Sequence, residues 1–262
     1  MRSYLINLAR RPDRLAAMQA RATSLGLALE RVEAVDARIA DMAALDHWFE
    51  GGGPLGEIPK GDKACLLSHR TAWELFLGTG EAHGVFLEDD VRLSASAGAL
   101  LGSDNWIPPG LDVVKLEHYG PPGQRVLLTD MRRVGEDFAL GRMLSRHTGA
   151  AAYILSRAAA QTLLDQARFA LPVDHLLFNP NNSPLFAGLS PWQLVPAIAR
   201  QQEFVGAPSD IEQTRIGLRK FGAAYVAREL VRFGYDLKLL PQQLAALLKG
   251  ARLVAMKTAD LF

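Results

Sequence analysis

Three consecutive carboxylates, Glu88, Asp89 and Asp90, end a short apolar run that begins at Gly84. The run holds β-branched and aromatic residues, which is typical of a buried strand. Ionised carboxylates must stay in water, be paired or hold a metal, so strand packing does not explain three of them in a row. Neighbouring side chains of an extended chain point to opposite faces, and Glu88 and Asp90 can therefore share one side.

Two oxygen ligands on one side suit a hard divalent cation, and such a cation can neutralise a substrate diphosphate. Asp90 and Glu88 are accordingly the predicted metal ligands. They follow a predicted central strand, and ligands of open α/β sheets bind at the carboxyl ends of the strands. The structural alternative is an acidic turn that caps a helix beginning near Ser94. Three acids at the end of a strand favour a metal site over a helix cap, but they do not exclude the cap.

The elements that must position this run are those of an α/β domain. A strand over 3–8, a helix from Pro12 to Leu25 and a strand over 29–35 form a βαβ unit, which implies a parallel pair. Apolar periodicity and cap residues predict further elements at 60–77 (helix), 112–117 (strand), 148–155 (strand), 157–167 (helix) and 192–195 (strand). The segment 120–146, with proline, glycine and scattered charge, receives no prediction.

The turn between the first strand and its helix is basic. It carries Asn7, Arg10, Arg11, Asp13 and Arg14. Arginines at the amino end of a helix oppose the helix macrodipole, so folding alone does not favour them there. They are better explained by an anionic ligand, and the alternative is a solvated basic face.

Composition limits the class of protein. The chain has 262 residues, a formal net charge of +1 and one cysteine, Cys65. The near-neutral charge gives no general case for nucleic acid, and a single cysteine excludes an internal disulfide and fits a reducing compartment. Arg10 and Arg11 interrupt the first apolar run, and no apolar run approaches membrane-spanning length. We therefore expect a soluble or peripheral protein in the cytoplasm.

The character of the chain changes at Ile211. Basic residues alternate with apolar ones over 211–232, and a leucine-rich segment with further basic residues follows to Arg252. We therefore divide the chain into a domain at 1–210 and a basic amphipathic helical tail at 211–262. Such a tail is typical of proteins that bind the anionic inner face of a membrane. Two helices that pack on the body with solvated basic faces explain the pattern equally well.

Four blocks within residues 1–205 resemble glycosyltransferase family 25, the lipooligosaccharide glycosyltransferases, which also include collagen galactosyltransferases. The third block, 86–90, looks like the family's DxD-type metal motif. The others are Ile6-Asn7-Leu8 with Arg11, Asp13, Arg14 and the later Ala34-Val35-Asp36; Gly61 with Cys65, Leu67, Ser68, His69 and Trp73; and Gly149 through Tyr153 to Ser156 with Pro172 and Asp174. Ala37, Ala64 and Asp62-Lys63 depart from the family pattern and leave the carboxylates intact.

The resemblance implies a GT-A fold, with a Rossmann-like, mostly parallel sheet flanked by helices and a nucleotide-sugar at its switch point. It also implies inverting transfer of a hexose from a UDP-sugar, usually UDP-galactose, to a saccharide hydroxyl in lipopolysaccharide or surface-glycan synthesis. Mn²⁺ or Mg²⁺ would stabilise the departing diphosphate. The implied donor-binding residues are Asn7, Leu8, Arg11, Arg14, Asp36, Ser68, His69, Glu88 and Asp89.

Inversion by single displacement needs a base for the acceptor hydroxyl. Asp174 aligns with the family's acceptor-side acid, and Pro172 fixes the backbone before it. His175 and Asp89 are competing candidates, and a cap on a helix beginning at His175 is the structural alternative for Asp174. Two other functions stay open, a UDP-glucose-dependent glucosyltransferase and a catalytically silent sugar-nucleotide-binding or membrane adaptor protein. The complete acid run favours an enzyme.

Overall fold

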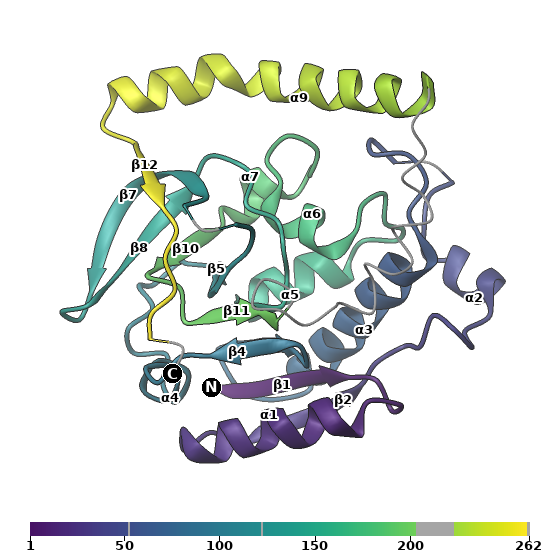
Figure 1. Ribbon diagram of the computed structural model, residues 1–262, viewed down its shortest axis with the longest axis vertical. Coiled ribbons are helices and arrows are strands. Elements are labelled where there is room, and N and C mark those ends of the chain that lie inside the picture. The colour runs from purple at the N-terminus through teal and green to yellow at the C-terminus, as the bar shows by residue number, and fades with distance from the viewer. Residues whose placement is uncertain (52, 122, 203–222, 261–262) are drawn as a thin grey trace.

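The computed structural model describes residues 1–51, 53–121, 123–202 and 223–260. Within these residues the main feature is a nine-stranded mixed sheet with helices against both faces, accompanied by a three-stranded sheet (Figure 1). The strands are β1 (Arg2–Asn7), β2 (Leu29–Glu33), β3 (His83–Glu88), β4 (Val91–Leu93), β5 (Val113–Lys115), β6 (Glu117–His118), β7 (Arg125–Val134), β8 (Phe138–Met143), β9 (Ala152–Ser156), β10 (Trp192–Val195), β11 (Ala199–Gln201) and β12 (Arg252–Ala255). The helices are α1 (Pro12–Ser24), α2 (Met42–Asp46), α3 (Lys60–Leu77), α4 (Ala97–Leu101), α5 (Arg157–Leu164), α6 (Val173–Phe178), α7 (Phe186–Leu189) and α9 (Ala223–Leu248).

The predicted βαβ unit is confirmed. β1 pairs in parallel with β2 on one side and with β3 on the other, so the strand that carries the acid run lies next to the first strand. Pro12 occupies the first turn of α1, and Gly26, with φ of +69°, follows the helix where a left-handed residue ends it. These local signals bring the carboxyl ends of β1 and β3 together at one edge of the sheet.

The rest of the sheet is mixed. The order is β12-β7-β8-β10-β5-β9-β3-β1-β2. β9 runs antiparallel to both β3 and β5, whereas β5 and β10 are parallel. Ser156 ends β9 and caps α5 by accepting from the Ala159 amide at 3.1 Å, as its position in the sequence predicts.

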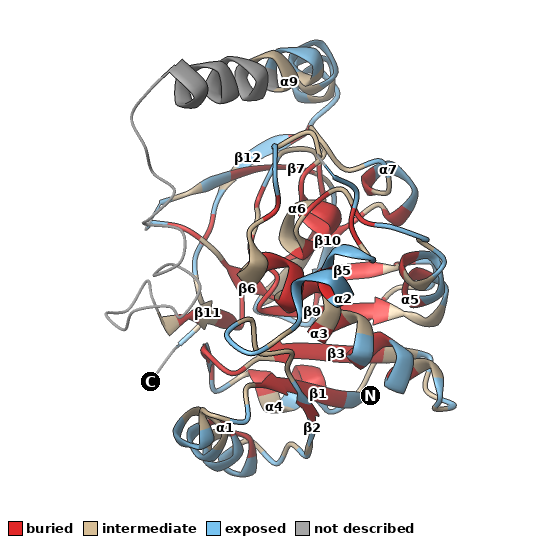
Figure 2. Cartoon of the chain, turned by 90° about the vertical axis from the view of Figure 1, so that its right-hand side faces the viewer, coloured by how far each residue is buried: buried red, intermediate tan, exposed pale blue. Residues whose placement is uncertain are grey.

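Alternation along the central strands divides the core into two layers. Tyr4 and Phe86 pack in the cluster beneath α3 and α5, while Leu5 and Val85 pack in the cluster on the opposite face of the sheet. All four side chains are fully buried, and Figure 2 shows the central strands in red between the helices. The strand β3 is thus buried on both faces up to the point where the acid run begins.

Two segments differ from the expectations. The unassigned stretch 120–146 contains β7 and β8, an antiparallel pair at one side of the sheet. Its polar residues are explained by exposure, because most of Thr129–Arg133 is only partly covered. The helix of the structural alternative for the acid run is α4, which begins at Ala97, and β4 separates it from the acid run, so the run does not cap it.

The C-terminal tail has one long helix and a strand. α9 takes the place of the second predicted helix and part of the first, and residues 211–222 of the expected tail lie outside the described residues. After α9 the chain returns to the main sheet, where β12 pairs antiparallel with β7 (Figure 1). Among the described residues, no helix has the length and apolarity needed to cross a membrane.

Candidate functional site

A cavity opens at the carboxyl ends of β1 and β3. Its lining comes from the β1–α1 turn, the segment after β2, one face of α3 and the acid run, together with four later segments at Tyr119, Gly149, Asp174 and Gln201. Residues far apart in the sequence therefore meet at this edge of the sheet. The position agrees with the general location of ligands in α/β sheets.

All three carboxylates of the acid run line the cavity. Asp89 accepts a hydrogen bond from Asn7 Nδ2 at 2.7 Å and pairs with Arg14 Nη1 at 3.0 Å. Asp90 Oδ2 lies 4.0 Å from the same guanidinium nitrogen. Among the described residues, buried Asp90 Oδ1 has no hydrogen-bond partner. Asp89 is therefore bound to the β1–α1 turn, whereas Asp90 retains an oxygen that a ligand could use.

Burial and mutual repulsion raise the pKa of two of these acids. Burial raises the pKa of Glu88 to about 8, and the neighbouring charges of Glu117 and Asp89 add to the effect. Burial also holds the pKa of Asp90 well above its ordinary value, with the charge of Glu88 as the next cause. Arg14 offsets only part of this effect on Asp90, so a bound cation would further stabilise the charged forms of Glu88 and Asp90.

A chain of hydrogen bonds behind the cavity orients Glu88. The Tyr153 hydroxyl lies 2.9 Å from Trp73 Nε1 and 2.7 Å from His69 Nδ1, and His69 Nε2 lies 3.2 Å from Glu88 Oε1. Since the indole nitrogen can only donate, the Tyr153 hydroxyl accepts from it and donates to His69 Nδ1. The proton of His69 therefore sits on Nε2 and points at Glu88. Burial lowers the pKa of His69 to about 3, which keeps the ring neutral.

Replacing Tyr153 by phenylalanine should destabilise the fold. The Tyr153→Phe variant leaves Trp73 Nε1 and His69 Nδ1 buried without partners, which we expect to lower the free energy of unfolding by roughly 2–4 kcal/mol. Urea denaturation measures this change. Tyr4→Phe is the matched control, because the buried Tyr4 hydroxyl has no hydrogen-bond partner among the described residues. Equal free energies of unfolding for the two variants would contradict the hydrogen bonds assigned to Tyr153.

Three side chains from α3 and β3 could also hold a softer metal. Ligand atoms of Cys65, His69 and Glu88 lie within 4.8 Å of one another. In the hydrogen-bonded arrangement, however, His69 Nε2 carries a proton and faces Glu88. His69, which the resemblance implies as a donor-binding residue, is fully buried and does not line the cavity, and it supports Glu88 from behind.

The basic turn also contributes to the lining of the cavity, beside the acid run. Arg10 and Arg14 both line it, and Arg10 Nε pairs with Asp36 Oδ2 at 2.8 Å. Burial alone would raise the pKa of Asp36, but hydrogen bonds from the Arg38 amide and from Arg10 hold it below its ordinary value. Arg11 precedes the first turn of α1 and pairs with Asp13 at 2.8 Å. Arg10, which the resemblance did not include, thus lines the cavity beside Arg14.

Of the other predicted donor-binding residues, some line the cavity and one lies buried behind its wall. Leu8 and Ser68 line the cavity, and the Ser68 hydroxyl accepts from the Val35 amide at 2.9 Å. Asn7 is buried behind the lining, where its amide nitrogen donates to Asp89 and to the Arg11 carbonyl. Ser68 therefore connects α3 to the segment after β2, and Asn7 connects the acid run to the β1–α1 turn.

Asp174 lines the same cavity from a different element. α6 begins at Val173, two residues before the expected start, with Pro172 at the cap position. Asp174 lies in the first turn, where Oδ1 accepts from the His175 amide at 2.8 Å and Oδ2 from the Gly149 amide at 3.5 Å. Asp174 is thus not the capping residue of a helix beginning at His175, and its carboxylate is tied to the strand region before β9.

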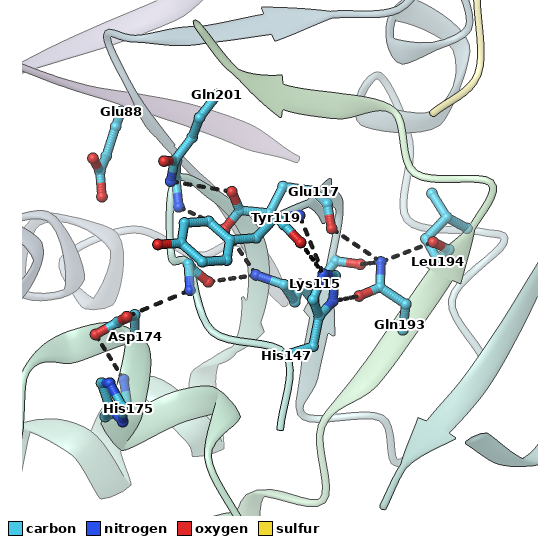
Figure 3. Close-up of polar contacts among 12 residues, drawn as sticks. Glu88, Lys115, Glu117, Tyr119, His147, Asp174, His175, Gln193, Leu194 and Gln201 are labelled. Carbon is cyan, nitrogen blue, oxygen red and sulfur yellow. Dashed lines mark hydrogen bonds and ion pairs between the residues drawn. The ribbon is translucent and has the colours of Figure 1, made fainter. Parts of the chain in front are cut away.

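Sequence reasoning missed two buried residues beside Asp174. Lys115 and Glu117 lie on the short strands β5 and β6, and they were read only as parts of a strand. Figure 3 shows them between Gln201 and Asp174. A signal was present, because opposite charges two residues apart on a strand share one face and can pair.

Comparisons with known proteins agree with this arrangement of motifs. The model of Glycosyltransferase family 25 (LPS biosynthesis protein) matches residues 1–177. The lacto-N-neotetraose biosynthesis glycosyltransferase LgtB of Neisseria gonorrhoeae is 31% identical over 219 residues, which are 77% of this chain and 75% of LgtB. LgtE of Neisseria meningitidis serogroup B, with the same descriptive name, is 27% identical over 223 residues, 75% of this chain and 78% of LgtE. The mouse inactive glycosyltransferase 25 family member 3 is 35% identical over 96 residues, 34% of this chain and 16% of that protein.

Proposed function

The chain belongs to glycosyltransferase family 25, and we propose that it transfers a hexose, with galactose as the first candidate, from a UDP-sugar to a hydroxyl of a saccharide acceptor. The transfer inverts the anomeric carbon and serves lipopolysaccharide or other surface-glycan synthesis. The observation that carries this proposal is the cavity, whose lining combines the three carboxylates of the acid run with Arg10, Arg14 and Asp174.

The residues of the acid run fit a divalent cation. Asp90 Oδ1 is a buried oxygen without a hydrogen-bond partner among the described residues, and Glu88 is a second oxygen donor with a raised pKa. Oxygen donors of this kind suit Mn²⁺ or Mg²⁺. Asp90 and Glu88 would hold the ion, and the bound ion would stabilise the charge that develops on the departing diphosphate.

The two arginines and Asp36 suit the nucleotide. Arg14 lies beside Asp89 and Asp90, so its guanidinium would reach a phosphate bound near the acid run. Arg10 and Asp36 form a pair at the cavity wall after β2, and a carboxylate there can accept hydrogen bonds from ribose hydroxyls. Leu8 supplies apolar lining to the same cavity.

Asp174 is our proposed catalytic base. It would accept the proton of the acceptor hydroxyl while that oxygen bonds to the anomeric carbon and the bond from this carbon to the diphosphate oxygen breaks. Attack opposite the leaving group inverts the carbon. Asp89 is the weaker candidate, because its carboxylate is bound to Arg14 and Asn7.

Two rival functions are separated by one experiment. UDP-galactose, UDP-glucose and UDP are each incubated with the protein, a panel of saccharide acceptors and Mn²⁺ or EDTA, and the melting temperature is measured together with UDP release. We expect one UDP-hexose to raise the melting temperature and to be consumed when Mn²⁺ is present. Consumption of UDP-glucose alone would identify the glucosyltransferase. Stabilisation without consumption under any acceptor would identify the silent binding protein, as in a relative described as inactive.

We also propose that α9 attaches the protein to an anionic membrane surface. Leucines at 237, 240, 244 and 247 recur at helical spacing, and their side chains are between 39% and 52% exposed. Lys238 and Lys249 are exposed on the same part of the chain. An apolar stripe beside basic residues is the composition of an interfacial helix.

Removing two of these leucines should weaken binding to vesicles. The double variant Leu240→Ser, Leu244→Ser loses roughly 2 kcal/mol of apolar burial in lipid, which is about a 30-fold change in partitioning. Sedimentation with vesicles that contain phosphatidylserine measures it. Point variants are preferred to truncation because β12 beyond α9 belongs to the sheet. Leu75→Ser on α3, where the leucine is 43% exposed, is the control. Equal binding by both variants would refute the attachment.

A further inference from the structure

Lys115 and Glu117 form a buried ion pair behind the side of the cavity that holds Asp174 (Figure 3). Lys115 Nζ lies 2.8 Å from Glu117 Oε1, and neither side chain is exposed. Removing two charges from water often costs as much free energy as their attraction returns, and an apolar pair of similar volume can be equally stable. Stability of the fold is therefore a weak explanation for this pair.

Lys115 fixes the backbone next to Asp174. Its ammonium donates to the Gly149 carbonyl and lies 4.4 Å from the centre of the Phe178 ring. The amide of Gly149 donates in turn to Asp174 Oδ2 at 3.5 Å, so the same residue is held between Lys115 and Asp174. Gly149 has φ of +89°, and a Cβ there would lie 2.6 Å from the Tyr119 ring. Only glycine fits this backbone conformation beside the Tyr119 ring, so glycine at position 149 allows the backbone to reach both Lys115 and Asp174.

Glu117 fixes two further parts of the same wall. Its Oε1 accepts from the Ala151 amide at 2.9 Å, and its Oε2 accepts from Gln201 Nε2 at 3.2 Å. Gln201 lines the cavity, and Ala151 directly follows lining residue Ala150. In Figure 3 the pair lies between Gln201 and Asp174. One ion pair thus joins three segments that are distant in sequence.

We propose that Lys115 and Glu117 are positioning residues for the acceptor side of the cavity. They hold residue Gly149 and Gln201 in place. Through Gly149, whose carbonyl accepts from Lys115 and whose amide donates to Asp174, they hold Asp174 in the orientation that proton transfer requires. The inference rests on the proposed function of Asp174 as the base. Beyond each other, the two side chains hydrogen-bond to Gly149, Ala151 and Gln201 on the acceptor-side wall. Glu117 also raises the pKa of Glu88, but removing Lys115 and Glu117 together leaves the net charge near Glu88 unchanged. Loss of the pair should therefore lower turnover and leave donor binding intact.

The test uses charge-balanced variants of the full chain. The double variant Lys115→Met, Glu117→Gln removes the pair without leaving one buried charge. We expect turnover at saturating donor and acceptor to fall by about 10²-fold, because a displacement near 1 Å of a reacting group has an effect of this size. The KM for acceptor should rise, while the Kd of UDP with Mn²⁺, measured by calorimetry, should stay within twofold of wild type.

The control is a pair with the same chemistry at the surface. Arg142 and Asp130 lie 2.8 Å apart with side chains 39% and 50% exposed, and Arg142→Met, Asp130→Asn should leave turnover unchanged. All assays run well below the melting temperature of each variant. If the double variant does not fold, Lys115→Arg decides, because arginine keeps the charge but not the geometry at the Gly149 carbonyl. It should then lower turnover tenfold or more with unchanged UDP affinity.

Turnover within threefold of wild type in the variant that folds would overturn the proposal, since the pair would then serve stability alone. A parallel loss of UDP affinity would also overturn it, because the pair would act on the whole cavity. Failure of the base assignment looks different. In that case Asp174→Asn itself retains turnover, whereas failure of the positioning role leaves Asp174→Asn inactive and the Lys115 variants active.

Discussion

Asp90→Asn is expected to lower transfer by roughly 10³-fold and to abolish its dependence on Mn²⁺. The reason is that a bound cation supplies several kcal/mol of charge stabilisation, and about 1.4 kcal/mol corresponds to a tenfold change in rate. Asparagine preserves the shape of the side chain but not its charge. Since Asp90 Oδ1 has no partner among the described residues, the substitution breaks no hydrogen bond of that oxygen.

Initial rates of UDP release at increasing Mn²⁺ concentration measure this effect, with the melting temperature as the check on folding. Asp165→Asn is the control, because Asp165 ends α5 and does not line the cavity. The variant should melt within a few degrees of wild type, since a cavity carboxylate contributes little to packing. Full activity of Asp90→Asn, or of the wild type in EDTA, would remove the metal from the mechanism.

Asp174→Asn is expected to lower turnover by about 10²–10⁴-fold with little change in the affinity for UDP, because a general base contributes on this scale to the chemical step alone. Asparagine keeps one acceptor oxygen, so it can still accept from the His175 amide within α6, and it gives up only the longer 3.5 Å hydrogen bond from the Gly149 amide. Turnover at saturating donor and acceptor is compared with the calorimetric Kd for UDP.

The competing base is tested in the same series. Asp89→Asn should weaken UDP binding, because it disturbs the pair with Arg14. Asp174→Asn should not. A loss of turnover below tenfold in Asp174→Asn would remove this residue from the reaction, and a selective loss of turnover in Asp89→Asn would transfer the role to Asp89.

Local signals made the first half of the fold predictable. Pro12, Gly26 and the apolar period of α1 define the βαβ unit, and the continuous apolar run of β3 placed Glu88 and the acid run at a strand end. The hairpin of β7 and β8 was missed because its middle is half exposed and basic, so its pattern lacks apolar alternation. The return of β12 to the sheet depends on pairing with β7, a contact between distant segments that no local pattern encodes.

The candidate site divides in the same way. Asp90 could be found from sequence because a run of acids after an apolar strand has few structural explanations. Arg10 and Arg11 are neighbours in one turn, and only the fold decides which of them lines the cavity. Lys115 and Glu117 needed the positions of Gly149 and Gln201, which lie on other elements and become neighbours only in the folded sheet.

The most direct test of the proposed activity is acceptor-dependent release of UDP. Purified protein is incubated with UDP-galactose, Mn²⁺ and a panel of saccharides with terminal hexoses or hexosamines, and UDP is quantified with time. We predict release that requires an acceptor, stops in EDTA and resumes when Mn²⁺ is restored, with a product whose new linkage has inverted anomeric configuration by NMR. Absence of acceptor-dependent release from every UDP-hexose, by a folded protein that binds UDP, would contradict it.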